Sequence, residues 1–385
     1  MESPRRSPAA AILSLSLLTV MAGAAVAPAL GVIKAFFSDA DPVLVQMIIS
    51  VPALFIVLTN AVFPALCRRF RSRTLALLGL VLYTAGGCVA GAFSNIYMVL
   101  VMRALVGIGV GIIMPLSTGL LSFYYPPEKL DGLMGLSSAM NQMGGVVATL
   151  LAGLLSNLSW RASFLVYLMG LLSILLCLAF LPNDSIAPPP GGTEKRSETF
   201  RAYFPYILAM FLLMSSFFLY PANFALETTA EGLIPQNLIA VIMAGMDLTA
   251  FLGGLLFVRC KLLLGRHMRL LAPILFLAGY LLLFLVGGWF GTLAGSVCVG
   301  FANGAGIPFL ISQSSLRAGR SAAATVMPLL SAALYLAQFL SPILMGAVSG
   351  IFGGIEHLPY CFASIQSAVF LLWSWRLPSE PDYPR

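Results

Sequence analysis

The chain has 385 residues, of which 21 are Lys or Arg and 14 are Asp or Glu, so 9% of its residues are charged, against about 25% in a soluble domain. Hydrophobic residues make up 59% of the sequence and the mean hydropathy is +0.96, which is more apolar surface than a soluble fold of this size can bury. These values exclude a soluble enzyme, a secreted disulfide scaffold and a disordered chain, and they predict a membrane protein.

Twelve apolar segments follow one another along the chain, each long enough to cross a bilayer as a helix of about 20 residues. They cover residues 10–36, 43–66, 74–93, 96–123, 133–155, 162–181, 204–225, 236–258, 270–289, 292–315, 322–348 and 358–375. A transmembrane barrel would show alternating segments of about ten residues, whereas these runs are continuous. The sequence therefore predicts an all-α membrane protein with twelve transmembrane helices in two six-helix bundles.

The first segment has the features of a secretory signal peptide as well as those of a membrane helix. Two arginines at positions 5 and 6 precede it, and residues 25–27 read Ala-Val-Ala, which imitates a cleavage site. Pro28 directly after that site disfavours cleavage, and the apolar run continues to Phe37. We expect a retained first helix, with a cleaved peptide as the alternative.

The longest polar stretch lies between the sixth and seventh segments. Three prolines and two glycines at residues 188–192 are typical of a flexible linker. The predicted organisation is an N-terminal bundle over 1–181, a cytoplasmic linker over 182–202 and a C-terminal bundle over 203–385.

The basic residues predict the orientation of the chain. With the N-terminus in the cytoplasm, 18 of the 21 Lys and Arg fall on the inner side, two on the outer side, and Arg103 within a segment. We therefore expect a multi-pass protein of the cytoplasmic membrane with both termini inside. Because the basic residues are explained by this topology, the positive net charge does not indicate a nucleic-acid partner, and we expect none.

Motifs of enzyme or metal chemistry are missing from the sequence. The six cysteines are scattered without a C-x-x-C pair, and the two histidines fall in loops on opposite sides. No nucleophile elbow, zinc-protease motif or P-loop is present. We predict neither an enzyme nor a bound metal or cofactor.

Three motifs in the first half resemble the major facilitator superfamily, specifically its drug:proton antiporter branch. Residues 59–79 (TNAVFPALCRRFRSRTLALLG) occupy the loop where the family carries a glycine-aspartate-arginine-glycine-arginine signature. Arg69 and Arg73 keep its basic positions, whereas Pro64 and Arg71 replace the glycines and Arg68 the aspartate. Residues 99–115 (VLVMRALVGIGVGIIMP) match the fourth-span signature, and residues 135–153 (GLSSAMNQMGGVVATLLAG) keep the fifth-span glycine spacing. Ala148-Thr149 stand where antiporters carry glycine-proline, which departs from that branch.

The resemblance implies a transporter that works by alternating access of two bundles around a central cavity. Segments one, four, seven and ten would line the cavity, and segments three, six, nine and twelve would face lipid. The lipid-facing segments are nearly free of amides and charges, whereas segments five, seven, ten and eleven carry polar and aromatic residues. The predicted cavity set is Asn141, Gln142, Phe217, Tyr220, Asn223, Asn303, Gln313, Tyr335 and Gln338. The predicted gating or packing set is Arg69, Arg73, Gly107, Gly109, Gly111 and Gly144. The two arginines come from the loop signature, as a gate or a topology anchor, and the glycines allow close helix approach.

Two charged residues lie deep within predicted segments. Asp247 is about 18 Å into its segment at 1.5 Å per residue, near the middle of the bilayer. An ionised carboxylate there costs about 2.5 kcal/mol or more, so protonation is favoured and Asp247 could carry a proton. The alternative is a structural carboxylate tied to a neighbouring helix. Arg103 stays charged; the resemblance implies a coupling role, and the alternative is an anchor for the glycine-rich helix.

We therefore predict proton-coupled export of a small amphipathic molecule by a monomer, with the substrate, protons and the lipid bilayer as partners. One alternative is an uncoupled facilitator or importer of a sugar, organic acid or other metabolite. Another is a membrane-bound sensor without transport.

Overall fold

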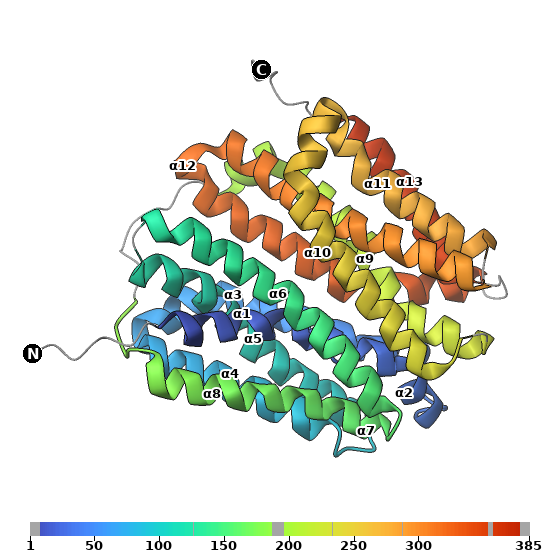
Figure 1. Cartoon of the computed structure of the whole chain (residues 1–385), viewed down its shortest axis with the longest axis horizontal. Helices are drawn as coiled ribbons and strands as arrows, with labels where there is room; N and C mark the ends of the chain where they lie inside the picture. The colour runs from blue at the N-terminus through green and yellow to red at the C-terminus, as the bar shows by residue number, and fades with distance from the viewer. Residues whose placement is uncertain are drawn as a thin grey trace, which may run out of the picture. The chain divides into compact units, whose positions relative to one another are not determined.

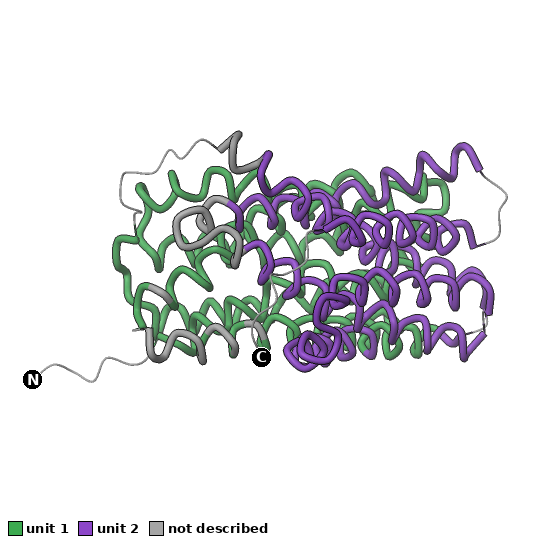
Figure 2. Tube along the Cα trace, turned by 90° about the horizontal axis from the view of Figure 1, so that it is seen from above, with its two compact units in different colours: residues 1–190, 236–244 green, residues 191–235, 245–385 purple. Residues whose placement is uncertain are grey.

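The computed structural model describes residues 8–125, 127–186, 196–232, 234–286, 288–352 and 357–377. These residues form helices and connecting turns and contain no strand (Figure 1). Two compact units divide the chain: unit 1 comprises 1–190 and 236–244, and unit 2 comprises 191–235 and 245–385 (Figure 2). Residues 187–195 of the predicted linker lie outside the described residues.

Unit 1 is built from the helices of the N-terminal half. In chain order they are α1 (Ala9–Ala24), η1 (Ala27–Ala29), α2 (Leu30–Phe36), α3 (Pro42–Arg69), α4 (Ser72–Ala90), α5 (Ile96–Tyr124), α6 (Pro127–Ser156), α7 (Trp160–Ser163), η2 (Phe164–Leu168) and α8 (Met169–Phe180). Pro28 has no backbone N–H and lies in the 3-10 turn η1, which divides the first apolar segment into α1 and α2.

Capping residues set several helix starts in unit 1. The Asp41 carboxylate accepts from the Val43 backbone N–H at 2.8 Å, and Pro42 occupies the first turn of α3. The Asn95 side chain caps α5 in the same way, accepting from the Tyr97 N–H at 2.9 Å. Each cap satisfies a backbone donor that has no partner inside its helix.

Unit 2 contains α9 (Arg196–Glu231), η3 (Gly265–His267), α11 (Met268–Leu281), the π-helical turn η4 (Leu282–Val286), α12 (Gly288–Phe352) and α13 (Leu358–Trp375). The helix α10 (Gln236–Leu264) contributes its first nine residues to unit 1 and the rest to unit 2. Gly265 adopts φ +49°, a left-handed conformation that favours glycine, and it ends α10.

Ten helical runs among the described residues are long and apolar enough to cross a membrane. One of them, Gln236–Val286, has 51 residues and would extend about 76 Å, far beyond a core of about 30 Å. It contains two of the twelve predicted segments, separated at Gly265. The last predicted segment, 358–375, coincides with α13. This helix is not among the ten runs, because Gln366 and three serines make it more polar. The ten runs and α13 together thus account for all twelve segments.

Candidate functional site

The side chain of Arg103 on α5 is completely buried and hydrogen-bonded by all three guanidinium nitrogens. Its Nε donates to the Ile48 carbonyl of α3 at 2.6 Å, and its Nη2 donates to the Ala22 carbonyl of α1. Its Nη1 donates to the hydroxyl of Tyr167 on η2, whose ring centroid lies 5.4 Å from the guanidinium carbon. The buried cation is therefore compensated by backbone dipoles and an aromatic face, and no carboxylate takes part in these contacts.

Two tyrosines that the sequence analysis did not select complete this network. Tyr167 donates to the Ala22 carbonyl at 2.7 Å, and its ring packs edge-on against Tyr83 at 5.2 Å. Both side chains are fully buried. Tyr167 lies in a segment that reads as a lipid-facing helix, and the usable signal was a phenol in so apolar a run, since a buried hydroxyl needs a partner.

The glycines of α5 lie where neighbouring backbones come closest. A Cβ on Gly107 would meet the Pro52 carbonyl oxygen of α3 at 2.4 Å, and one on Gly109 would meet the Gly79 carbonyl oxygen of α4 at 2.6 Å. Gly111 faces Thr59 of α3 in the same manner, at 2.6 Å from its Cβ. These three positions hold α5 against two helices at once, which is packing that a larger residue would prevent.

Polar residues join α1 to α6 in unit 1. The Ser16 and Ser137 hydroxyls lie 2.7 Å apart, and Thr19 Oγ1 contacts the Asn141 side-chain oxygen. A Cβ on Gly144 would meet the Leu17 carbonyl oxygen at 2.0 Å, so α1 and α6 cross there without a side chain between them. Gln142, next to Asn141, is half-buried.

The two arginines of the predicted gating set differ in environment. Arg69 is exposed at the end of α3, whereas Arg73 is half-buried on α4 and its Nε donates to the Cys177 carbonyl of α8 at 3.2 Å. Arg73 thus fastens α4 to α8.

In unit 2 the predicted residues of α9 gather around Tyr220. Its hydroxyl lies 2.6 Å from Ser296 Oγ of α12, and the side chain is fully buried. Asn223 is buried and its amide donates to the Leu219 carbonyl at 2.9 Å. Phe217 is half-buried and packs edge-on against Phe218 at 5.2 Å.

Asp247 on α10 is half-buried and lies close enough to Tyr220 to act on it electrostatically. Because Tyr220 also pairs with Ser296, Asp247 lies within electrostatic range of a hydroxyl pair in the same unit. Such a group can hold a proton or a polar substituent of a ligand.

The remaining predicted residues lie along α12. Asn303, Gln313 and Gln338 are buried, and Tyr335 is half-buried. The Asn303 side-chain oxygen has no hydrogen-bond partner among the described residues. An unsatisfied amide oxygen in a buried position is available to a water or a ligand.

The sequence of this chain is similar to one protein family and to several curated proteins. The family model described as Major Facilitator Superfamily matches residues 12–342. Curated relatives include the methylenomycin A resistance protein of Bacillus subtilis, 33% identical over 26% of this chain and 22% of its own length. The probable multidrug resistance protein EmrY of Escherichia coli is 29% identical over 32% of this chain and 25% of its own length. The chain thus matches about a quarter of each relative.

Solved structures match nearly the whole chain. A bacterial homologue of the human lysosomal transporter Spinster, inward-facing and unoccupied, gives a TM-score of 0.75 at 17% identity, covering 97% of this chain and 96% of that one. The nucleoside transporter NupG gives 0.75 at 13% identity, covering 96% and 97%. At such identities the likeness establishes the fold alone, and it confirms the predicted all-helical membrane fold.

Proposed function

Because the chain belongs to the Major Facilitator Superfamily, and so is a multi-pass membrane transporter and no enzyme, we propose that it exports a small amphipathic molecule in exchange for protons. The observation that carries the proposal is the position of Asp247, half-buried within α10 and within electrostatic range of Tyr220. A carboxylate within a membrane helix is expensive when ionised, so it serves as a proton carrier more readily than a surface acid.

Arg103 supports the exchange in a different way. Its guanidinium stays charged and cannot carry the transported proton. Its three hydrogen bonds hold α1, α3, α5 and η2 together, so it would keep unit 1 rigid while the transporter changes orientation. We propose that Arg103 contributes to the coupling of proton and substrate movement only through this positioning of the helices.

The substrate class is inferred from the residues assigned to the cavity. Asn141, Gln142, Asn223, Asn303, Gln313 and Gln338 offer neutral hydrogen-bonding groups, and Phe217, Tyr220 and Tyr335 offer aromatic surface. This mixture suits an amphipathic molecule better than a highly charged one. The relatives named for methylenomycin A and multidrug resistance favour export of such molecules.

The experiment measures proton movement in proteoliposomes that contain the purified chain and the pH-sensitive dye pyranine, with ethidium as the first amphipathic probe. We expect probe transport to move protons in the wild type and Asp247→Asn to abolish that coupled signal. Asp39→Asn, at an exposed loop position, is the matched control and retains it. Unaltered coupling in Asp247→Asn would remove Asp247 from this role.

An uncoupled facilitator or importer is the second candidate, and one observation favours it. Ala148 and Thr149 are both buried on α6 where antiporters have glycine-proline. Transport of a sugar, organic acid or other metabolite that a protonophore leaves unchanged would support this candidate over the antiporter. For either function we propose the cytoplasmic membrane, with both termini inside; cysteine labelling at Glu2 or Tyr383 from the exterior would contradict that orientation.

A further inference from the structure

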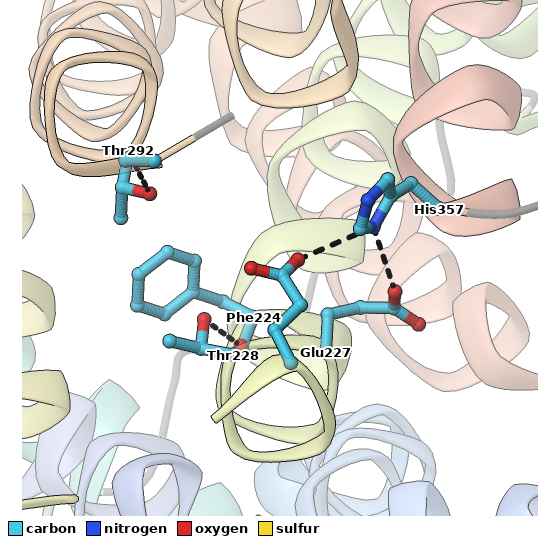
Figure 3. Close-up of polar contacts among 7 residues, drawn as sticks. Phe224, Glu227, Thr228, Thr292 and His357 are labelled. Carbon is cyan, nitrogen blue, oxygen red and sulfur yellow. Dashed lines mark hydrogen bonds and ion pairs between the residues drawn. The ribbon is translucent and has the colours of Figure 1, made fainter. Parts of the chain in front are cut away.

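Three potential metal ligands from distant parts of the chain meet at one end of unit 2. Glu227 and Glu231 lie one turn apart near the end of α9, and His357 directly precedes α13. Figure 3 shows Glu227 and His357 facing each other. Their ligand atoms all lie within 4.8 Å of one another. The sequence predicts no metal site, because about 130 residues separate the histidine from Glu227 and no local motif joins them.

The spacing of these atoms fits a transition-metal ion. His357 Nδ1 lies 3.5 Å from Glu227 Oε2 and 3.2 Å from Glu231 Oε1. Ligands at about 2.0–2.2 Å in tetrahedral positions around zinc lie about 3.3–3.5 Å from one another. Two residues at i and i+4 can bind the same ion from one helix face. The two distances from the imidazole therefore match the spacing around a zinc ion, and the two carboxylate oxygens, which lie within 4.8 Å of each other, can rotate toward the same ion.

The charge of the cluster also favours a cation. Two carboxylates face one imidazole nitrogen, which has at most one proton to donate. With a charged imidazolium the cluster still has a net charge of −1, and with a neutral ring it has −2. In the described part of the chain, no lysine or arginine forms an ion pair with either glutamate. A divalent ion would neutralise the excess charge.

The site is both accessible and supported. The His357 and Glu227 side chains are 25% and 26% exposed, so an ion can enter from solvent. The imidazole packs almost parallel to the Tyr360 ring, 6.2 Å between centroids, which orients it toward α9. Imidazole with carboxylate oxygens suits Zn²⁺ better than Ca²⁺ or Mg²⁺, which prefer oxygen ligands alone.

We propose that Glu227, Glu231 and His357 form a Zn²⁺ site, with water in the open coordination position, that fastens the end of α9 to the start of α13. This inference does not depend on the transported substrate or on proton coupling. A ligand that binds only the folded chain raises its unfolding midpoint, so occupancy of the site has a readout other than transport.

The test titrates ZnCl₂ into the purified, tag-free, EDTA-treated chain in detergent, followed by calorimetry and by thermal unfolding. We expect one zinc equivalent that raises the unfolding midpoint. His357→Asn is the first variant, because asparagine tolerates the left-handed backbone of this position, φ +54°. It is expected to weaken this binding by at least about tenfold and to remove the zinc-dependent rise in the midpoint.

Two further variants make the outcome decisive. Glu231→Gln changes an exposed residue, so we expect the variant to fold even if His357→Asn does not. It is expected to lose the same zinc binding. His267→Asn removes the other histidine, which lies exposed in η3, and is expected to bind zinc like the wild type. The six free cysteines contribute an equal background to all variants. Equal zinc binding by the wild type, His357→Asn and Glu231→Gln, or no binding by the wild type at millimolar ZnCl₂, would leave only an ion pair and overturn the proposal.

Discussion

Arg103 and Tyr167 converge on the same acceptor, the backbone carbonyl of Ala22. Arg103 donates to that carbonyl and to the Tyr167 hydroxyl, and Tyr167 donates to the carbonyl at 2.7 Å. The three groups form a closed triangle in which each group is hydrogen-bonded to the other two. A buried network of this kind stabilises only when it is complete.

Removing the guanidinium should therefore destabilise the chain strongly. Arg103→Met leaves the Ile48 and Ala22 carbonyls without this donor in a buried position, at an expected loss of about 2–4 kcal/mol. Tyr167→Phe removes one donor to Ala22 and also the acceptor of the buried Arg103 Nη1, so it should cost about 1–3 kcal/mol. Unfolding in mixed micelles measures both, with Arg69→Met at an exposed position as the control. A loss in Arg103→Met no larger than in Arg69→Met would contradict the network.

Two glycines on α5 offer a matched pair for the packing argument. A Cβ at Gly109 would lie 2.6 Å from the Gly79 carbonyl oxygen, whereas one at Gly119 would meet nothing within 4 Å. We expect Gly109→Ala to cost about 1–3 kcal/mol through overpacking and Gly119→Ala to be neutral or to stabilise by about 0.5–1 kcal/mol, since alanine favours the helix. Thermal unfolding midpoints compare the two directly. Similar midpoints would show that α5 does not pack through Gly109.

The contact between Tyr220 and Ser296 should appear as a coupling energy. Their hydroxyl oxygens are 2.6 Å apart between α9 and α12. A double-mutant cycle with Tyr220→Phe and Ser296→Ala should give about 0.5–1.5 kcal/mol. The same cycle with Ser367→Ala, whose hydroxyl donates to the Ala363 carbonyl of its own helix, should be additive. Equal coupling in the two cycles would contradict a specific bond.

Ionisation of Tyr124 is expected to lower the stability of the folded chain at high pH. It lies beyond the apolar run of α5 and donates to the Asp184 carboxylate at 2.9 Å. Burial, and then the hydrogen bond to Asp184, raise the pKa of Tyr124 to about 12, against about 10 in the unfolded chain. The folded state holds this proton more tightly, so the contribution is complete below pH about 10 and is lost as the pH rises toward about 12.

The measurement for Tyr124 is the thermal unfolding midpoint as a function of pH. Tyr124→Phe should flatten the fall above pH about 10, because phenylalanine has no proton to lose. Tyr97→Phe, at a 63% exposed position, should follow the wild type. Parallel curves for all three proteins would refute the assignment.

The helices were predictable from the sequence because lipid requires long apolar runs. The predicted segment 43–66 lies within α3, 236–258 lies within α10, and 358–375 coincides with α13. The superfamily was also predictable, since residues 99–115 carry its signature, and the match over 12–342 confirms it. The antiporter branch and the roles of the selected residues stay predictions.

The contacts of the site were not predictable, because they join residues that are far apart in the sequence. Arg103 could be selected as a buried charge, yet its acceptors at Ala22 and Ile48 lie 81 and 55 residues away. Periodicity indicates which face of a helix is buried but not which carbonyl faces it. The meeting of Glu227 with His357 depends in the same way on tertiary packing.

The 3-10 turn at Ala27–Ala29 forms a hinge between the two helical pieces of the first membrane segment. Pro28 offers no backbone N–H, so bending at this point breaks fewer hydrogen bonds than bending anywhere within α1. The short helix α2 (Leu30–Phe36) can therefore bend relative to α1, which keeps Ala22 in contact with Arg103 and Thr19 in contact with Asn141. Bending of α2 at this hinge therefore need not disturb the polar contacts of α1.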